Sequence, residues 1–401
     1  MGPIDGVRVL DLTVGIAGPY ATRLLADYGA DVIKVERPSG DFTRGLGPFR
    51  GDTPHPEKSG TFLYFNTNKR SIVLDLRATA GAGVMAALIE WADVVVESFK
   101  PGVLERFGVG WDFIHGRKPA ISLVSISNFG QESPYRDYEG TELTLYGFGG
   151  EMFSMGVAER EPVMMFGTAA LVESGAAAAN AVMASLFLTH RQGIGQHVDF
   201  SIVDSQFGGA DRRHVASIAV EFAGRRTGRN PLDSSGVLRG VYPCADGYVE
   251  FTGAGTRLDR FREMLGHPEW LSDPRWDAPG AIFQADNAAE FDGNFYPWLY
   301  QHTKKEIWAK ARDARVLCGP LFTIDELVAD HHFRERGFWA AVEHPVAGSF
   351  EMPGRPFIMN ASPWEVHRPA PLLGQHTREI LSDAGIATDE QDRLFAAGVV
   401  A

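Results

Sequence analysis

Residues 6–36 read GVRVLDLTVGIAGPYATRLLADYGADVIKVE, and this stretch contains a complete β-α-β pattern. Gly6–Thr13 is a short run with β-branched residues that ends at a turn, and Ala30–Glu36 is a second such run. Between them, Pro19 stands where the first turn of a helix tolerates proline, because that position needs no backbone N–H donor. Tyr20–Tyr28 continues with apolar residues at helical spacing. A strand, a helix and a strand in this order predict a parallel sheet.

The same alternation continues along the chain. A helix is expected over Ala78–Trp91, a strand over Ala92–Glu97 and a further strand over Ile121–Ser127. Strands that alternate with helices favour a doubly wound α/β core. The clearest helix is Ala169–Thr189, whose alanine and glycine residues allow the backbone of another element to approach closely.

The second half of the chain has a different character. The composition turns polar around Arg225–Ser235, where we place a linker. Helices separated by loops follow, and they predict a smaller α+β domain; they are expected over Leu258–Leu265, Ala288–Tyr300 and Lys304–Arg315. Strands return from about Phe333.

Composition restricts the function. The 401 residues include 38 lysine and arginine against 51 aspartate and glutamate residues, a formal net charge of −13. A negative field disfavours nucleic acid and anionic membrane surfaces as partners, so an anionic ligand needs local cations and backbone N–H groups. The two cysteines, Cys244 and Cys318, lack CxxC spacing and are expected to be small core residues. Neither a metal site, a nucleotide-binding P-loop nor a hydrolase triad is indicated.

The N-terminus lacks the charged and apolar regions of a secretory signal. The longest small, apolar stretch, Ala176–Leu188, is interrupted by Asn180 and Ser185 and is expected to be a buried helix rather than a membrane span. A cytoplasmic protein without a membrane partner is therefore expected.

Several short motifs follow one another in a fixed order. They are residues 6–13 with 17–20 (AGPY), residues 66–76 (NTNKRSIVLDL), residues 97–102 (ESFKPG) with Arg106, residues 127–130 (SNFG), residues 161–204 and residues 370–377 (APLLGQHT). In this order and spacing they resemble the class III CoA-transferases, a family that includes formyl-CoA and carnitine CoA-transferases and the related α-methylacyl-CoA racemases.

The resemblance implies a fold, an assembly and two substrates. The fold is a Rossmann-like large α/β domain joined by linkers to a small α+β domain, and two chains form an interlocked dimer. The large, CoA-binding domain is expected in residues 1–224, the small domain in residues 225–330, and the return linker with the C-terminal part of the large domain in residues 331–401. The substrates are an acyl-CoA and a carboxylic acid, and coenzyme A is carried as part of the acyl-CoA.

The resemblance also implies a coenzyme site. Arg37 and Arg106 are expected to reach the head of CoA, since charge-assisted hydrogen bonds are the strong ones for phosphate. Arg37 follows the carboxyl end of the second strand, where open α/β sheets bind ligands. The full set of expected coenzyme-binding residues is Arg37, Leu74, Arg77, Ser98, Phe99 and Arg106. The alternative is that the arginines are solvated surface residues and Phe99 a core aromatic.

A leucine stands where the family has its carboxylate nucleophile. Counting back from Gly195 without gaps places Leu171 at that position. Glu173 is the nearest carboxylate, but two residues along a helix rotate a side chain by roughly 200°. Glu142 matches an acidic position in both the transferases and the racemases. Glu142 and Glu173 are therefore the candidate catalytic residues, with a helix-terminal carboxylate as the alternative for Glu173 and a structural carboxylate for Glu142.

Further departures keep three functions open. Ile16 stands where transferases often have glutamine, Arg225–Gly236 lacks the family's glycine-rich loop, and Gly140 is not followed by the histidine that the racemases use. The first hypothesis is CoA transfer, in which this chain is a subunit without the nucleophile and an Asp-bearing paralogue is its partner. The second is an acyl-CoA racemase, isomerase or lyase that uses a glutamate base, and the third is a non-catalytic CoA-binding module.

Overall fold

The computed structural model describes residues 2–208, 213–225, 228–229, 238–252, 257–278 and 280–401. The chain forms two compact units: the larger contains residues 1–154, 163–227 and 336–401, and the smaller contains residues 155–162 and 228–335. The ranges expected from the sequence differ from these units mainly at residues 155–162, which group with the smaller unit. Most of the linker expected over Arg225–Ser235 lies outside the described residues.

A six-stranded parallel sheet lies in the larger unit, in the order β3-β2-β1-β4-β5-β6. The register sets Leu10 of β1 beside Ile33 of β2 and Val95 of β4. Both faces of such a sheet are covered, which explains its short runs of apolar residues. The predicted parallel α/β class is confirmed. The strands are β1 Arg8–Leu12, β2 Asp31–Glu36, β3 Lys69–Val73, β4 Val94–Glu97, β5 Ser122–Ser127 and β6 His197–Ser201.

Alternate residues of each strand point to opposite sides of this sheet, so the sheet has two apolar faces. Helices cover both of them. Leu10 and Leu12 of β1 belong to one core cluster, and Val9 belongs to the other. The first cluster is completed by α3 (Gly81–Trp91), α5 (Trp111–Arg117), α16 (Thr377–Asp383) and α17 (Thr388–Ala396). The second is completed by α1 (Ala17–Asp27), α8 (Ala169–Gln192) and α9 (Ile202–Phe207).

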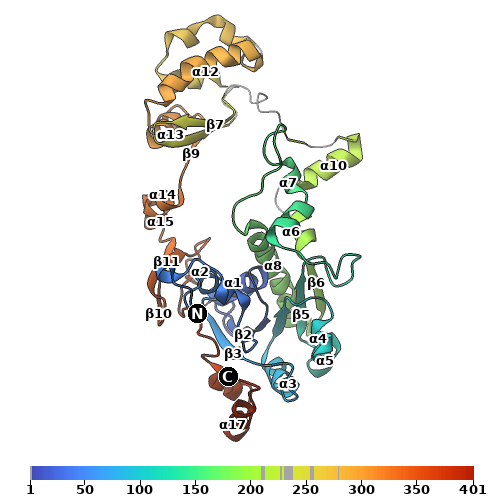
Figure 1. Ribbon diagram of the computed structural model, residues 1–401. Helices are drawn as coiled ribbons and strands as arrows, with labels where there is room; N and C mark the ends of the chain where they lie inside the picture. Colours follow the sequence, from blue (N-terminus) through green and yellow to red (C-terminus); the bar gives the residue numbers. More distant parts are fainter. Residues whose placement is uncertain (1, 209–212, 226–227, 230–237, 253–256, 279) are drawn as a thin grey trace. The chain divides into compact units, whose positions relative to one another are not determined.

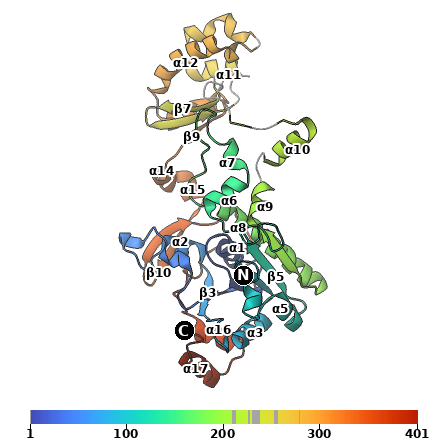
Figure 2. The same cartoon turned by 45° about the vertical axis from the view of Figure 1, so that its right-hand side comes forward.

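The backbones of α1 and α8 approach closely, and both views show the two helices side by side (Figures 1 and 2). A Cβ atom at Gly175 of α8 would lie 2.6 Å from the carbonyl oxygen of Ala17 in α1. The expectation that small residues in this helix permit such an approach is confirmed. Helix α8 ends at Gly193, whose φ of 68° is the left-handed conformation that favours glycine.

Helix α8 has 24 residues and is the described helix whose length and apolar composition would suffice to cross a membrane. A core helix meets the same criteria. One face of α8, with Ala170, Ala178 and Val182, packs into the core beside the sheet. Packing inside the larger unit thus accounts for the apolar residues on that face of α8.

The C-terminal segment packs against β3, where α16 lies beside the strand (Figure 2). Arg70 of β3 pairs with Glu379 and Asp383 of α16, at 2.9 and 2.6 Å. Leu74 forms an isolated β-bridge with Val400. The N-terminal and C-terminal parts of the chain therefore share one unit.

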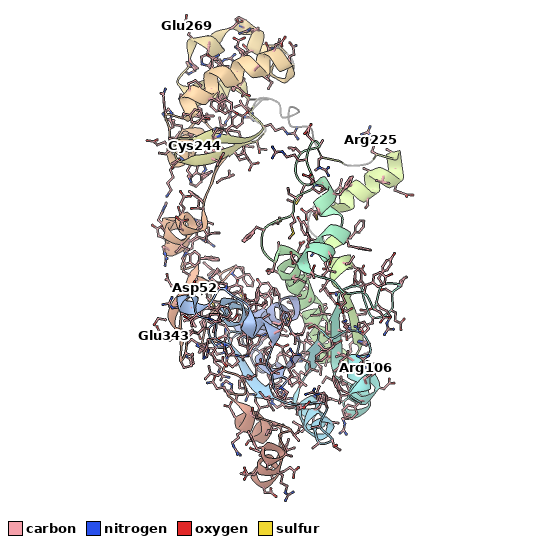
Figure 3. The ribbon with its side chains drawn as sticks, in the orientation of Figure 1. Asp52, Arg106, Arg225, Cys244, Glu269 and Glu343 are labelled. Carbon is pink, nitrogen blue, oxygen red and sulfur yellow. The ribbon has the colours of Figure 1, made fainter. Side chains whose placement is uncertain are left out.

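The smaller unit contains a three-stranded antiparallel sheet and its own aromatic core. Cys244 of β7, marked in Figure 3, is buried in that core, and Cys318 of β9 packs against it. Both thiols are free; the expected core position is confirmed for Cys244, whereas Cys318 is only partly buried. The elements are β7 Gly240–Cys244, β8 Gly247–Phe251, α11 Leu258–Leu265, η5 Glu269–Ser272, η6 Pro274–Asp277, η7 Ala281–Phe283, α12 Ala285–Leu299, α13 Lys304–Asp313, β9 Cys318–Leu321, α14 Ile324–Ala329 and α15 His331–Glu335.

The remaining elements belong to the larger unit and connect or extend its layers. They are η1 Phe42–Gly45, η2 Arg50–Asp52, α2 Gly60–Phe65, α4 Val103–Arg106, α6 Glu142–Phe148, α7 Glu151–Ser154, α10 Arg213–Ala223 and the hairpin of β10 Trp339–His344 with β11 Gly348–Pro353.

Candidate active site

Two adjoining cavities open at the carboxyl ends of the parallel strands, the edge at which open α/β sheets bind ligands. The β3-side cavity has a volume of about 470 Å³ and is lined by residues that include Leu12, Arg37, Leu74, Arg77 and Phe99. The α8-side cavity has a volume of about 380 Å³, and its lining residues include Ile16, Phe99, Arg136, Glu142 and Leu171. Val14 and Phe99 line both cavities, so these two residues form the wall between them.

The expected coenzyme-binding residues fall mostly on the β3-side cavity. Arg37, Leu74, Arg77 and Phe99 line it. The Arg37 Nε–H donates to the Gly40 carbonyl oxygen at 3.1 Å, and Arg77 pairs with Asp75 at 2.9 Å while remaining exposed. The side chains of Arg37 and Arg77 are therefore exposed to solvent where they line this cavity.

Arg106 lines neither cavity. It lies on the exposed side of α4, where Figure 3 marks it, and Val103 and Phe107 on either side of it in sequence line the β3-side cavity. Arg106 therefore stands next to the cavity expected to hold the coenzyme, on the helix that forms part of its wall.

Ser98 lines the α8-side cavity, and its hydroxyl is engaged with the neighbouring loop. The Ser98 Oγ accepts a hydrogen bond from the Val14 N–H at 2.9 Å and lies 3.3 Å from the Val14 carbonyl oxygen. Since Val14 is part of the wall between the cavities, Ser98 fixes the position of that wall.

Glu97 supports the other half of the same wall. It ends β4, is 4% exposed, and accepts a hydrogen bond from the Phe99 N–H at 2.7 Å. Burial raises the pKa of Glu97 to about 7, although the bonds from Ser125 and from the Phe99 N–H oppose the rise. Glu97 is not among the residues that line either cavity, and the sequence predictions did not include it.

A buried network of charges holds the loop that connects β1 to α1. Lys34 pairs with Asp41 at 3.0 Å and donates to the Thr13 carbonyl oxygen at 2.9 Å. Burial would raise the pKa of Asp41, but Lys34 and the donors on Thr43 lower it below its usual value. The Gly15 N–H also points to the Asp41 carboxylate, at 3.3 Å. These bonds hold the loop that carries Val14, a residue that lines both cavities.

Glu142 connects the cavity to the start of α8. Its two carboxylate oxygens accept hydrogen bonds from the N–H groups of Ala170 and Leu171, at 2.8 and 3.1 Å. The first N–H groups of a helix have no partner within the helix, and a carboxylate near them is favoured by the helix dipole. Glu142 therefore acts as a cap of α8 while it lines the α8-side cavity.

Leu171 and Glu173 occupy different places. Leu171 lines the α8-side cavity and packs against the core beside the sheet. Glu173 is half-buried and is not among the residues that line either cavity. Both belong to α8, so the roughly 200° of rotation between them accounts for the difference.

The site contains polar residues that the sequence predictions did not identify as ligand-binding, among them Lys100, Ser127, Asn128, Arg136 and Tyr138. Ser127 and Asn128 stand at the carboxyl end of β5, a position that the strand pattern could have indicated. Arg136 and Tyr138 lie on an irregular loop whose path gives no sequence signal. Among the described residues, no group of three or more metal-binding side chains is present.

Comparisons with known proteins agree with this architecture. The family model for CoA-transferase family III matches residues 4–377. A succinyl-CoA–D-citramalate CoA-transferase of Chloroflexus aurantiacus is 32% identical, over 99% of this chain and 98% of its own length. The subunit BbsE of a succinyl-CoA:(R)-benzylsuccinate CoA-transferase of Thauera aromatica is 30% identical, over 98% of this chain and 97% of its own length.

A solved structure shows the same fold. A CAIB/BAIF family protein from Brucella suis superposes with a TM-score of 0.83 at 26% identity, covering 96% of this chain and 99% of the other. The resemblance carried by the motifs is thereby confirmed over nearly the whole length. This chain belongs to CoA-transferase family III.

Proposed function

We propose that this chain takes part in the transfer of CoA from an acyl-CoA to a carboxylic acid, as a subunit that binds the coenzyme but lacks the nucleophile. One observation carries the proposal. The residue at the start of α8 that lines the α8-side cavity is Leu171, and an aliphatic side chain offers no nucleophile.

The reaction requires a carboxylate on the enzyme. That carboxylate attacks the thioester carbonyl, CoA thiolate leaves, and a mixed anhydride forms. The thiolate then attacks the enzyme carbonyl, which releases the donor acid and leaves an enzyme–CoA thioester. The acceptor carboxylate attacks this thioester to give a second mixed anhydride, and the released thiolate attacks the acceptor's carbonyl. Acceptor-CoA forms, and the enzyme carboxylate is regenerated.

Glu142 is poorly placed to do this, since both of its oxygens hold the N-terminus of α8. An attack by Glu142 would remove the acceptors of two helix N–H groups, a loss of about 1–3 kcal/mol for each group left buried without a partner. A carboxylate from another chain avoids that loss. The relative BbsE is named a subunit, which supports an assembly of unlike chains.

The coenzyme is proposed to bind across both cavities. Its head would lie in the β3-side cavity near Arg37, Arg77 and Arg106, and its thioester would lie beyond Phe99 in the α8-side cavity. The strand order 3-2-1-4-5-6 is that of Rossmann-like domains, which supports this placement at the sheet's carboxyl edge.

We further propose an interlocked dimer, of like or unlike chains, in the cytoplasm. Uncovered apolar side chains on two helices support an assembly, because exposed patches of this kind mark interaction surfaces. Phe187 of α8 is 67% exposed, and Val215 and Phe222 of α10 are 58% and 84% exposed. The ranges 1–224, 225–330 and 331–401 are proposed as the domains of each chain.

A second candidate function is favoured by Glu142 itself, which is a carboxylate on the cavity wall. It could serve as the base of an acyl-CoA racemase, isomerase or lyase. Deuterium exchange at the α-carbon of an acyl-CoA by the isolated chain would favour this function over CoA transfer.

The experiment compares CoA transfer by the purified chain, by its Leu171→Asp variant, and by the chain mixed with an Asp-bearing paralogue. Free-CoA binding by each sample is measured in parallel. We expect binding without transfer in the wild type and transfer once the paralogue is present. Transfer by the wild type alone would overturn the proposal, and CoA binding without transfer in any sample would leave a coenzyme-binding module.

A further inference from the structure

Three buried carboxylates lie at or near the carboxyl ends of β1, β2 and β4, and cations neutralise two of them. Asp11 of β1 pairs with Lys69 at 2.9 Å, and Glu36, the last residue of β2, pairs with Arg44 at 2.8 Å. Glu97 ends β4 in the same way, but no ion-pair partner contacts it in the part of the chain that the structure describes. A buried carboxylate without a cation is costly to ionise, so its surroundings decide whether Glu97 carries a charge.

A chain of hydrogen bonds connects Glu97 to the edge of the sheet. Glu97 stands beside Ser125 of β5 in the parallel register, and the Ser125 hydroxyl is hydrogen-bonded to its carboxylate. The same Ser125 Oγ lies 2.9 Å from Nε2 of His197 on the edge strand β6. Ser125 is 2% exposed, whereas His197 is exposed to solvent. The chain therefore runs from the protein surface, through one hydroxyl, to the buried carboxylate.

The charged groups around this chain are mostly acids. Burial raises the pKa of Glu97, and Glu105 of α4 and Asp199 of β6 raise it further. Burial lowers the pKa of His197, although Asp199, Glu105 and Glu132 oppose that fall. Surroundings of this kind favour a neutral Glu97 and a neutral His197 more than an aqueous environment does.

Helix α5 holds the outer end of the chain in place. The ring of Trp111 stacks on His197 with 5.7 Å between the ring centroids, and it also stacks on His115 of the same helix at 4.6 Å. Stacking on a large aromatic ring restricts the orientation of the His197 imidazole, so its Nε2 stays directed toward Ser125.

Both charge states of Glu97 keep the chain fully hydrogen-bonded. With Glu97 ionised, Ser125 donates to the carboxylate and accepts from the Nε2–H of His197. With Glu97 protonated, Glu97 donates to Ser125, and Ser125 donates to Nε2 while the imidazole proton lies on Nδ1. Glu97 can therefore change its charge without leaving a buried polar atom unsatisfied.

We infer that Glu97 is a positioning residue for the coenzyme, whose ionised form fixes Phe99 between the two cavities and whose protonated form holds it more loosely. The Phe99 N–H donates to the Glu97 carboxylate at 2.7 Å, and Phe99 lines both cavities. A hydrogen bond to a carboxylate is roughly twice as strong as one to a neutral acceptor. The inference rests on the proposed function, in which the coenzyme extends past Phe99. CoA should then bind more weakly as pH falls through the pKa of Glu97.

The test compares the pH dependence of CoA binding by the purified chain and by variants of the hydrogen-bond chain. Calorimetry with free CoA is run from about pH 6 to about pH 8, on either side of the Glu97 pKa of about 7. Glu97→Gln cannot titrate, and Ser125→Ala removes the bridging hydroxyl. The matched controls are Glu90→Gln, at an exposed acid of α3, and Ser122→Ala, which removes a buried hydroxyl of β5 that accepts from the Gln196 N–H. Titration of the CoA phosphates is common to all samples and cancels in the comparison.

Relative to Glu97→Gln, the affinity of the wild type for CoA should fall by about fivefold from the upper to the lower pH, the difference between a charged and a neutral hydrogen bond. Ser125→Ala should move the midpoint of this fall to higher pH, because the Ser125 hydroxyl lowers the pKa of Glu97. Glu90→Gln and Ser122→Ala should follow the wild type.

Parallel pH profiles of the wild type and Glu97→Gln, or an unmoved midpoint in Ser125→Ala, would overturn the inference and leave the proposed function standing. If Glu97→Gln does not fold, the midpoint in Ser125→Ala decides alone. Failure of every sample to bind CoA would overturn the proposed function as well.

Discussion

The Glu142 carboxylate accepts a hydrogen bond from the Leu171 N–H at 3.1 Å, and its other oxygen accepts one from the preceding N–H, on Ala170, at 2.8 Å. The cavity's own carboxylate is thus bound to the residue that stands where a nucleophile is expected. An arrangement that secures the helix start in this way favours a structural role for Glu142 over a chemical one.

Removing that cap should destabilise the larger unit. Glu142→Ala leaves two N–H groups of α8 without their acceptors, and we expect a loss of about 1–2 kcal/mol in the free energy of unfolding. Glu142→Gln keeps one acceptor oxygen and should lose less. Urea titration measures both, with the exposed Glu132→Gln as the control. If Glu142→Ala is as stable as the wild type but abolishes catalysis by the assembled enzyme, Glu142 is a chemical group instead.

Glu97 should make stability depend on pH. Its folded pKa of about 7 lies above the usual value of 4.5, because burial disfavours its charge. The folded state therefore holds this proton more tightly than the unfolded state does, and the stability from Glu97 is lost as pH rises from about 4.5 through 7. The loss should amount to roughly 3 kcal/mol and should be absent in Glu97→Gln. Unfolding titrations across this range measure it, with Glu90→Gln expected to follow the wild type; parallel curves for Glu97→Gln and the wild type would refute the assignment.

The buried pair of Lys69 and Asp11 should not tolerate the loss of one partner. Both side chains are fully buried, 2.9 Å apart, and Lys69 also donates to the Pro19 carbonyl oxygen at 2.9 Å. Lys69→Met removes the ion-pair partner of the buried Asp11 carboxylate, which should destabilise the protein by about 3–5 kcal/mol, although Lys34 and the hydroxyls of Thr13 and Thr22 still face that carboxylate. Thermal unfolding should show this at neutral pH, whereas the exposed Lys310→Met should behave as the wild type. If Lys69→Met destabilises the protein no more than Lys310→Met does, the ion pair of Lys69 and Asp11 is not formed.

Two glycines in helices offer a matched test of the contact between α1 and α8. Gly175→Ala places a methyl group 2.6 Å from the Ala17 carbonyl oxygen, and overpacking of this kind should destabilise by about 1–3 kcal/mol. A Cβ atom built at Gly83 of α3 would meet no other atom within 4 Å. Gly83→Ala should therefore raise the free energy of unfolding by about 0.5–1 kcal/mol, because alanine has the higher helix propensity. Equal effects of the two substitutions in chemical denaturation would contradict the close approach of the helices.

The proposed coenzyme site can be tested with two arginine variants, which should bind CoA more weakly. Arg37→Ala and Arg106→Ala should each weaken CoA binding by about 1.5–3 kcal/mol if each side chain bonds to a phosphate. Calorimetry with free CoA measures the loss, and Arg50→Ala on η2 serves as the surface control. Unchanged affinity in the double variant would remove both residues from the site.

The sequence predicted those parts of the fold that depend on local pattern. The β-α-β unit of residues 6–36 and the small-residue helix over 169–189 were expected within a few residues of β1, α1, β2 and α8, because apolar spacing and glycine positions determine them. The grouping of residues 155–162 with the smaller unit was not expected. It depends on contacts with distant parts of the chain, which periodicity does not record.

The candidate site was predicted less completely. Arg37, Leu74, Arg77 and Phe99 were expected to bind the coenzyme, and all four line the β3-side cavity. They follow strands whose ends can be recognised in the sequence. The roles of Glu97 and Ser98 as supports of the cavity wall depend on hydrogen bonds to the backbone of other loops, which have no sequence signature. Arg136 lies on an irregular loop, so its place in the lining of the α8-side cavity could be recognised only in three dimensions.

The central claim, that the nucleophile is not on this chain, is tested most directly by trapping the covalent intermediate. The enzyme, assembled from this chain and an Asp-bearing paralogue, is incubated with an acyl-CoA and treated with hydroxylamine, which converts an activated carboxyl group into a hydroxamate. Both chains are then digested and mapped by mass spectrometry. We expect the hydroxamate on an aspartate of the paralogue and none on this chain. A hydroxamate on Glu142 or Glu173 would contradict the claim and would make this chain the carrier of the nucleophile.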